Sequence, residues 1–147
     1  MDAFDADVLI YAAVRDHALG RRVLALLPSE PVEAAAGRTG VGSVLLLPEL
    51  LSKPLREGRD SELSALGAIL ARLDLRIVDD ATARLAVALA ARYRLSAADA
   101  VHLATAVAVG ADRFLTNNHR DFPKGITEIA VTYPDELPDP APEPKEA

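Results

Sequence analysis

Acidic side chains follow or interrupt four separate apolar stretches of the chain. Asp5 and Asp7 come directly after "MDAF", Glu49 lies within "SVLLLPELL", Asp99 lies within "LSAADAVHL", and Asp121 follows "RFLTNNHR". Carboxylates that are held close together cannot all stay ionised unless a cation balances their charge. A divalent ion accepts oxygen ligands, lowers the pKa of a bound water and stabilises the leaving oxygen of a phosphodiester. If these acids meet in space, the pattern indicates hydrolysis that depends on Mg²⁺ or Mn²⁺.

The composition excludes several other kinds of site. The chain contains no cysteine, which rules out disulfides and thiolate zinc sites, and no two of its three histidines have zinc-ligand spacing. No GxSxG or Walker sequence is present, so neither a serine nucleophile elbow nor a P-loop is expected. The net charge of −6 argues against a protein that binds nucleic acid through bulk charge, although a local basic patch remains compatible with it.

The same composition indicates where the protein acts. The 147 residues suffice for one domain with a single core, and no apolar run is long enough to span a bilayer. The first residues lack the basic stretch of a secretion signal. We therefore expect a cytoplasmic protein with no membrane contact.

Hydrophobic periodicity predicts an alternation of strands and helices. The predicted strands are residues 3–6, 75–80, 113–117 and 126–133, and residues 29–42 hold turn residues around a further strand or irregular piece. The predicted helices are residues 7–16, 18–27, 43–55, 58–73, 80–95 and 95–110. This alternation predicts an α/β fold with a mostly parallel central sheet flanked by helices.

Turn and capping residues set the expected boundaries. Ser43 and Ser96 are predicted helix N-caps, and Asp99 is placed to complete a capping box with Ser96. Pro54 is expected to end one helix and Gly110 another. We expect one domain over residues 1–133, and we predict that the proline-rich residues 134–147 are disordered.

In an open parallel sheet, functional groups gather at the carboxyl ends of the strands. Asp5 and Asp7 follow the first predicted strand, and Asn117, Asn118 and Asp121 follow the strand "RFLTN". Glu49 and Asp99 lie early in predicted helices. The acids are therefore expected to meet at one edge of the sheet.

The segments "FDADVLIYA", "SVLLLPELLSKP" and "LSAADAVHLATAVAVGADRFLTNNHRDF" resemble the successive motifs of PIN-domain ribonucleases, in particular the VapC-type toxins of bacterial toxin–antitoxin pairs. The resemblance runs from about residue 3 to residue 133. It implies an α/β/α sandwich and a metal-dependent endoribonuclease that binds Mg²⁺ or Mn²⁺. It also implies a cognate antitoxin partner and a homodimer.

The resemblance also implies roles for individual residues. Asp5, Glu49 and Asp99 correspond to the first three metal-binding acids. Asp121 is the preferred fourth acid, since Asn118 offers only a neutral ligand or supporting group. The family more often has Asn or Ser where Asp7 stands, so Asp7 takes a secondary role.

Each of these residues also has a purely structural interpretation. Asp5 is a good N-cap, and Asp7 suits the first turn of a helix. For Thr116 two roles are expected: it donates a hydrogen bond to a ligating carboxylate or a phosphate, or it only ends a strand. His102 lies one turn after Asp99 and is expected to pack and hydrogen-bond rather than act as a base.

Two other functions remain open. A haloacid-dehalogenase-like phosphatase also uses an early Asp-x-Asp, although its first Asp follows a longer apolar strand than "MDAF". The second is a PIN-like module that binds a partner without catalysis. The complete set of four acids argues against it.

Overall fold

The computed structural model describes residues 1–29 and 40–140. Its five strands form one sheet in the order β3-β2-β1-β4-β5, and every neighbouring pair is parallel. The strands are β1 (Asp2–Phe4), β2 (Gly40–Ser43), β3 (Asp74–Arg76), β4 (Arg113–Leu115) and β5 (Ala130–Thr132). The predicted α/β fold with a parallel central sheet is confirmed.

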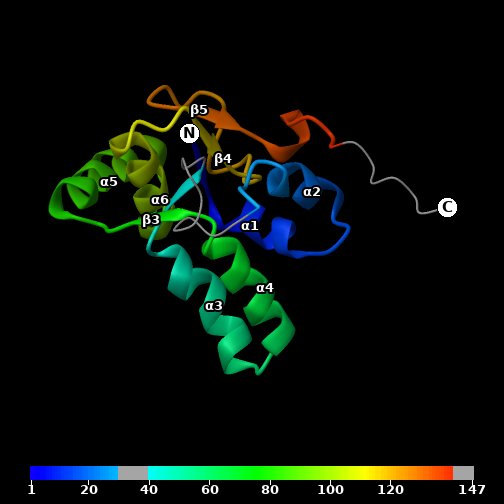
Figure 1. Cartoon of the computed structure of the whole chain (residues 1–147). Coiled ribbons are helices and arrows are strands. Elements are labelled where there is room, and N and C mark those ends of the chain that lie inside the picture. The colour runs from blue at the N-terminus through cyan, green and yellow to red at the C-terminus, as the bar shows by residue number, and fades with distance from the viewer. Residues whose placement is uncertain (30–39, 141–147) are drawn as a thin grey trace.

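Helices cover both faces of this sheet (Figure 1). They are α1 (Ala6–Ala13), α2 (Ala18–Leu24), α3 (Leu46–Arg56), α4 (Asp60–Leu70), α5 (Asp80–Tyr93) and α6 (Ala97–Ala108). Neighbouring strand residues point to opposite faces: Ala3 packs in the core with α5 and α6, whereas Phe4 packs in the core with the other four helices. The protein is therefore an α/β/α sandwich with two hydrophobic cores.

The strand order creates a switch point between β1 and β4. From β1 the chain moves outward through β2 and β3, and it then returns on the other side of β1 with β4 and β5. Ligand sites in such sheets lie where the order reverses, at the carboxyl ends of the two central strands. Asp5 directly follows β1 and Thr116 directly follows β4, so both residues stand at this point.

Two predicted boundaries of α3 are wrong. Ser43 belongs to β2, and Leu45 precedes the helix, although the Ser43 hydroxyl still accepts a hydrogen bond from the Leu45 N–H at 3.1 Å. Pro54 lies inside the helix, which continues to Arg56. A proline this close to the end removes only one backbone hydrogen bond, and the N–H groups of Glu57 and Arg59 still reach the carbonyls of Lys53 and Pro54.

The predicted caps of α6 are confirmed. Ser96 is the N-cap, and its hydroxyl accepts a hydrogen bond from the Asp99 N–H at 3.3 Å. Gly110 has a φ of 72°, a left-handed conformation that glycine adopts without steric cost and that turns the chain toward β4.

The prediction that disorder begins at residue 134 is wrong for the first residues of this segment. Pro134–Glu136 form the short 3-10 helix η1, and Pro134 and Leu137 are buried. The Arg22 guanidinium of α2 donates hydrogen bonds to the carbonyls of Asp135 and Leu137, at 3.2 and 2.8 Å. The proline-rich composition predicted disorder for the whole segment. Two buried side chains and the hydrogen bonds from Arg22 are enough to order its first residues. Residues 141–147 lie outside the described residues.

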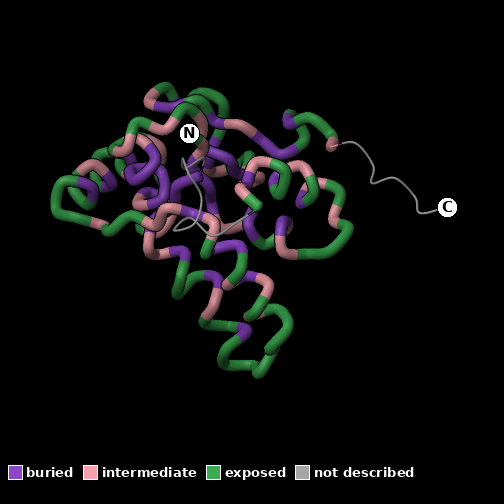
Figure 2. Tube along the Cα trace, in the orientation of Figure 1, coloured by how far each residue is buried: buried purple, intermediate pink, exposed green. Residues whose placement is uncertain are grey.

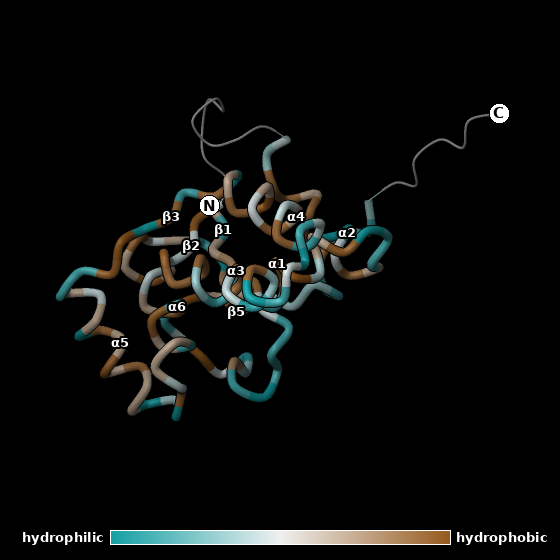
Figure 3. Tube along the Cα trace, turned by 90° about the horizontal axis from the view of Figure 1, so that it is seen from below, coloured by the Kyte–Doolittle hydropathy of each residue, from teal (hydrophilic) through white to brown (hydrophobic). Residues whose placement is uncertain are grey.

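Burial and hydropathy follow the three-layer architecture. Buried residues gather around the sheet, whereas the α3–α4 hairpin projects away from it and is largely exposed toward its tip (Figure 2). Along α5, hydrophobic and hydrophilic segments alternate, as expected of a helix that covers a sheet with one face (Figure 3). Within residues 1–29 and 40–140, no helix is both long and apolar enough to cross a membrane.

Candidate active site

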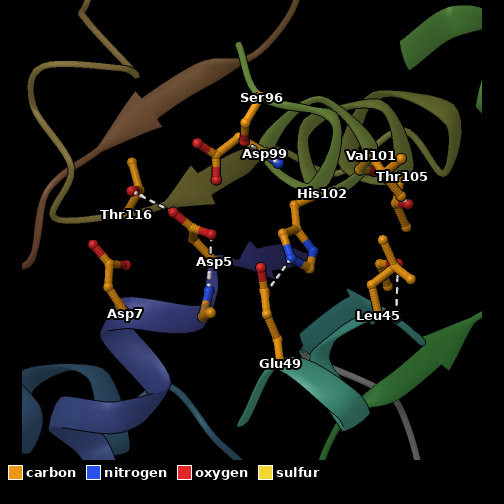
Figure 4. A network of polar contacts seen from close by, with 12 residues as sticks. Asp5, Asp7, Leu45, Glu49, Ser96, Asp99, Val101, His102, Thr105 and Thr116 are labelled. Atoms are coloured by element: carbon orange, nitrogen blue, oxygen red, sulfur yellow. Dashed lines mark hydrogen bonds and ion pairs between the residues drawn. The ribbon is translucent and has the colours of Figure 1, made fainter.

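Asp5 is the buried acid at the switch point, with a fractional exposure of 5% (Figure 4). It is the N-cap of α1, and its Oδ1 accepts a hydrogen bond from the Ala6 N–H at 2.9 Å. Its Oδ2 accepts a hydrogen bond from the Thr116 hydroxyl at 2.8 Å. The Thr116 oxygen in turn accepts the Asn118 N–H at 3.1 Å, so the single hydroxyl proton is directed at Asp5. The end of β4 therefore holds the carboxylate that follows β1.

Asp7 belongs to the same group of side chains. Its Oδ2 accepts a hydrogen bond from the Asn117 N–H at 3.0 Å, and its Oδ1 accepts one from the Val8 N–H at 2.7 Å. The loop after β4 thus contacts both acids that follow β1. Asp7 is closer to the predicted site than its secondary rank suggested.

Asp99 reaches the same place from the first turn of α6, and Figure 4 shows its carboxylate above those of Asp5 and Asp7. The Ser96 cap and this position occur together, because the first turn of α6 lies at the sheet edge where β1 ends. The structural and the functional interpretations of Asp99 are therefore compatible.

Burial and mutual repulsion raise the pKa of all three carboxyls. Burial, and secondly the charge of Asp7, raise the pKa of Asp5 to about 7. Burial raises the pKa of Asp7, and the charge of Asp99 adds to this rise. Burial also raises the pKa of Asp99, to which the charges of Asp121 and Glu49 contribute. The three acids therefore face one another across a common space.

Glu49 approaches the group from α3 and is paired with a histidine. Its Oε2 lies 2.6 Å from Nε2 of His102, which is buried on α6 with an exposure of 2%. Nδ1 of His102 is buried and has no hydrogen-bond partner among the residues that the structure describes. An Nε2–H tautomer donates to Glu49 and leaves only a lone pair unpaired at Nδ1. The prediction that His102 packs and hydrogen-bonds is confirmed, but its partner is Glu49.

Asp121 and Asn118 hold each other in the loop after β4. The Asn118 Nδ2 donates to Asp121 Oδ2 at 2.9 Å, and the Asp121 N–H donates to Asn118 Oδ1 at 3.1 Å. Both polar atoms of the amide are therefore occupied with Asp121. The same loop contacts Asp5 through Thr116 and Asp7 through Asn117, and the charge of Asp121 contributes to the raised pKa of Asp99.

The donor set suits a hard divalent cation. In the described part of the chain, no three acidic or histidine side chains are arranged to enclose a metal ion as they stand. The side chains nonetheless offer carboxylate oxygens, and the pKa of three of these groups is raised by burial and by neighbouring negative charge. This is the chemistry that Mg²⁺ and Mn²⁺ require, so the residues fit such an ion.

Tyr11 was not predicted as part of the site, whereas Asn117 was expected at this edge of the sheet. Asn117 binds Asp7 through its backbone, and its side-chain Nδ2 donates to the Tyr11 hydroxyl at 3.4 Å. Tyr11 lies four residues after Asp7, and that helical spacing is the sequence signal that places it on the same face of α1.

Comparison with known proteins gives one family and a group of similar folds. The profile of the PIN domain matches residues 3–125. A toxin–antitoxin complex from Klebsiella pneumoniae contains a chain of similar fold, with a TM-score of 0.68 at 22% identity over 91% of this chain and 98% of that one. DNA-bound VapBC from Salmonella typhimurium gives 0.69 at 18% identity over 90% and 97%. FitAcB from Neisseria gonorrhoeae gives 0.61 at 20% identity over 93% and 100%. No curated protein sequence matches the chain.

Proposed function

The chain belongs to the PIN domain family, a family of nucleases, and from this we propose that it is a metal-dependent endoribonuclease and the toxin of a toxin–antitoxin pair. The observation that carries the proposal is the meeting of Asp5, Asp7 and Asp99 at the switch point of the sheet. Ionised carboxylates that lie this close repel one another, and a bound cation removes that repulsion.

Asp5, Glu49, Asp99 and Asp121 are the residues that we expect to hold Mg²⁺ or Mn²⁺. When bound, the ion supplies an activated water and stabilises the leaving oxygen of a phosphodiester. Asp7 adds negative charge beside Asp5 and Asp99, which favours binding of the ion further.

Neighbouring polar side chains orient these acids. Thr116 donates to Asp5, His102 lies in hydrogen-bonding contact with Glu49, and Asn118 holds Asp121 at two points. Thr116 and His102 are far in sequence from the acids that they orient, whereas Asn118 lies in the same tight loop as Asp121. The positions of Asp5 and Glu49 therefore depend on the folded sheet. We assign these three residues a positioning role.

The proposed substrate is RNA, in the cytoplasm. The net charge of −6 implies that contacts to the phosphates are few and local, so cleavage is expected to be salt-sensitive yet selective. Single-stranded or looped segments, whose bases are accessible, are the expected targets.

An antitoxin is the proposed protein partner, by analogy with the complexes in which similar folds occur. An apolar groove of about 280 Å³ between α1 and α4 supports it. Ile10 and Val14, which are 43% and 50% exposed, lie in the groove. Its lining is Ile10, Ala13, Val14, Ala65 and Leu66, with Ser61 and Glu62 as the polar members. An apolar side of a partner helix suits such a groove.

A homodimer is the second proposed assembly. Ile77 and Val87 are 75% and 70% exposed, so both side chains are available for an apolar contact with a second copy. Sedimentation of the purified protein tests this, and a monomer at micromolar concentration contradicts it.

The nuclease proposal is tested with purified protein and single-stranded RNA in the presence of Mn²⁺. We expect cleavage that EDTA abolishes and that Asp5→Asn and Asp99→Asn each reduce by about 100-fold or more, since metal ligands contribute several kcal/mol to such reactions. Glu57→Gln, a change of an exposed acid on the far end of α3, serves as the matched control. Intact RNA with the wild-type protein would remove the proposal.

The toxin proposal needs a separate test in cells. Induced expression of the wild-type chain is expected to arrest growth, and Asp5→Asn is expected to relieve the arrest. Co-expression of a small DNA-binding protein encoded beside the gene should also relieve it. Arrest that persists in Asp5→Asn contradicts a toxin that acts through its nuclease site.

The phosphatase and the non-catalytic binding module fare differently against the family match. The family assignment removes the reason for a haloacid-dehalogenase-like phosphatase, because Asp5 and Asp7 fall within a PIN domain instead. A non-catalytic binding module predicts that no divalent ion binds, so a Mn²⁺ titration separates it from the nuclease.

A further inference from the structure

A tyrosine and an amide extend the acid cluster along α1. The Asn117 N–H donates to Asp7, and the Asn117 side chain donates to the Tyr11 hydroxyl. Asn117 therefore links the Tyr11 hydroxyl to the carboxylate of Asp7. A group bound at the acids and a group bound at Tyr11 would be neighbours.

Tyr11 is paired with a second ring. The rings of Tyr11 and His17 stack in parallel, with centroids 4.6 Å apart and planes inclined by 7°. Both residues are half-buried. Nδ1 of His17 accepts the Gly20 N–H at 3.1 Å and caps α2, which leaves Nε2 as the ring's other polar atom.

The ring pair is held rigidly. A Cβ at Gly20 would lie 1.9 Å from the Tyr11 carbonyl oxygen, so α1 and α2 approach here as closely as backbone allows. This contact fixes the Tyr11 backbone, and the cap fixes the His17 ring. A rigid pair of rings loses little conformational entropy when a flat ligand binds.

The other aromatic side chains are used elsewhere. All three phenylalanines are buried in the cores, and Tyr93 bonds to Glu128. Tyr133 is buried, donates to the Phe122 carbonyl and carries the stacked ring of His119. Tyr11 and His17 are thus a half-exposed ring pair that is linked to the acids by Asn117.

We propose that Tyr11, His17 and Asn117 form a subsite for one unpaired nucleobase next to the phosphate at the acid cluster. The inference rests on the proposed function and names a substrate contact within that site. Unpaired bases bind proteins by stacking on Tyr and His rings and by hydrogen bonds from amides and hydroxyls, which are the groups present here. Because the chain is acidic, stacking supplies affinity that bulk charge does not.

The experiment measures kcat and KM with Mn²⁺ on a short single-stranded RNA and on copies of it that carry one abasic position each. For the wild type, we expect one abasic position next to the cut to raise KM about 10-fold, as loss of one base stack does. Tyr11→Leu should raise KM on the intact RNA by about the same factor and make that abasic position neutral. The kcat should change little, because the acids are untouched.

Two further variants keep the test independent of folding defects. His17→Asn removes the ring and keeps an N-cap side chain, and it should raise KM as Tyr11→Leu does. Tyr11→Phe keeps the stack and should retain the abasic sensitivity. Glu57→Gln, the exposed acid at the end of α3 that serves as the control above, should leave KM unchanged.

The outcomes separate this inference from the proposed function. A wild-type protein that cleaves RNA, with variants that keep both the KM and the full abasic penalty, overturns the subsite and leaves the nuclease intact. A wild-type protein that cleaves no RNA overturns both.

Discussion

Nε2 of His102 lies 2.6 Å from Oε2 of Glu49, so a buried histidine of α6 contacts the carboxylate that α3 presents to solvent. The two residues are 53 positions apart in sequence. Without this contact, Glu49 is a long side chain on an exposed helix turn, free to adopt many rotamers. The contact turns it toward Asp5 and Asp99.

Removing this contact should weaken metal binding. His102→Ala is expected to lower Mn²⁺ affinity by about 10–100-fold, the usual effect of losing a group that orients a metal ligand. His102→Gln should recover part of the affinity, because its amide also donates to Glu49. Isothermal titration with Mn²⁺ measures both, and equal affinities for wild type and His102→Ala would show that Glu49 needs no such support.

The stability of the metal-free protein should fall as the pH rises. The pKa of Asp5 is raised from 3.8 to about 7 in the folded state, mainly by burial. Between these values the folded protein holds a proton that the unfolded chain releases, so ionisation favours unfolding. Asp5→Asn removes this penalty and should be more stable than wild type at pH 8 by on the order of 2–4 kcal/mol, with a smaller gain at pH 5. Urea unfolding in EDTA at both pH values measures it, and a gain that does not depend on pH contradicts the assignment.

Divalent ions should reverse this instability. Ligand that binds only the folded state at 100 times its Kd adds about 2.7 kcal/mol to the free energy of unfolding. We expect Mn²⁺ to raise the melting temperature of the wild type at pH 8, and to raise that of Asp99→Asn much less. A monovalent salt at equal ionic strength provides the control. Equal shifts in the two proteins would place the ion away from Asp99.

Asp121 and Asn118 should differ in their effects on cleavage. If Asp121 is the fourth acid, Asp121→Asn lowers kcat by about 100-fold, whereas Asn118→Ala lowers it by about 10-fold through loss of positioning. Both substitutions leave Thr116 and Asp5 in place. Single-turnover RNA cleavage measures the two, and the reverse order would make Asn118 the site residue.

Thr116→Val should destabilise the fold more than Thr116→Ser. Valine has nearly the same shape but leaves Asp5 Oδ2 and the Asn118 N–H without their partner, at a cost of about 1–3 kcal/mol. Serine keeps the hydroxyl and loses only a methyl group. Denaturant unfolding at pH 7 compares the variants, and equal stabilities would show that the hydroxyl contributes nothing to the site.

The sequence by itself determined the fold class and the order of helices and strands, and it named candidate acids at the ends of strands and the starts of helices. Each of these depends on local signals: the period of apolar residues, capping groups such as Ser96, and carboxylates that stand just after strands. Local signals also misplaced the ends of α3 and the start of the tail. Pro54 is tolerated because it lies near the end of α3, and the segment after Pro134 is held by Arg22 of α2, a contact that a short window of sequence does not contain.

Only the tertiary structure decided which residues act on which acid. The strand order puts β1 beside β4, and this brings Thr116 to Asp5 and Asn117 to Asp7 across more than 100 positions. The packing of α3 and α6 around the same sheet edge brings Glu49 to His102. Hydrogen bonds and electrostatic repulsion act over a few ångströms of space, whereas sequence patterns report only neighbours along the chain. Candidate acids could therefore be named in advance, but their hydrogen-bond partners and the upward shift of the pKa of Asp5, Asp7 and Asp99 could not.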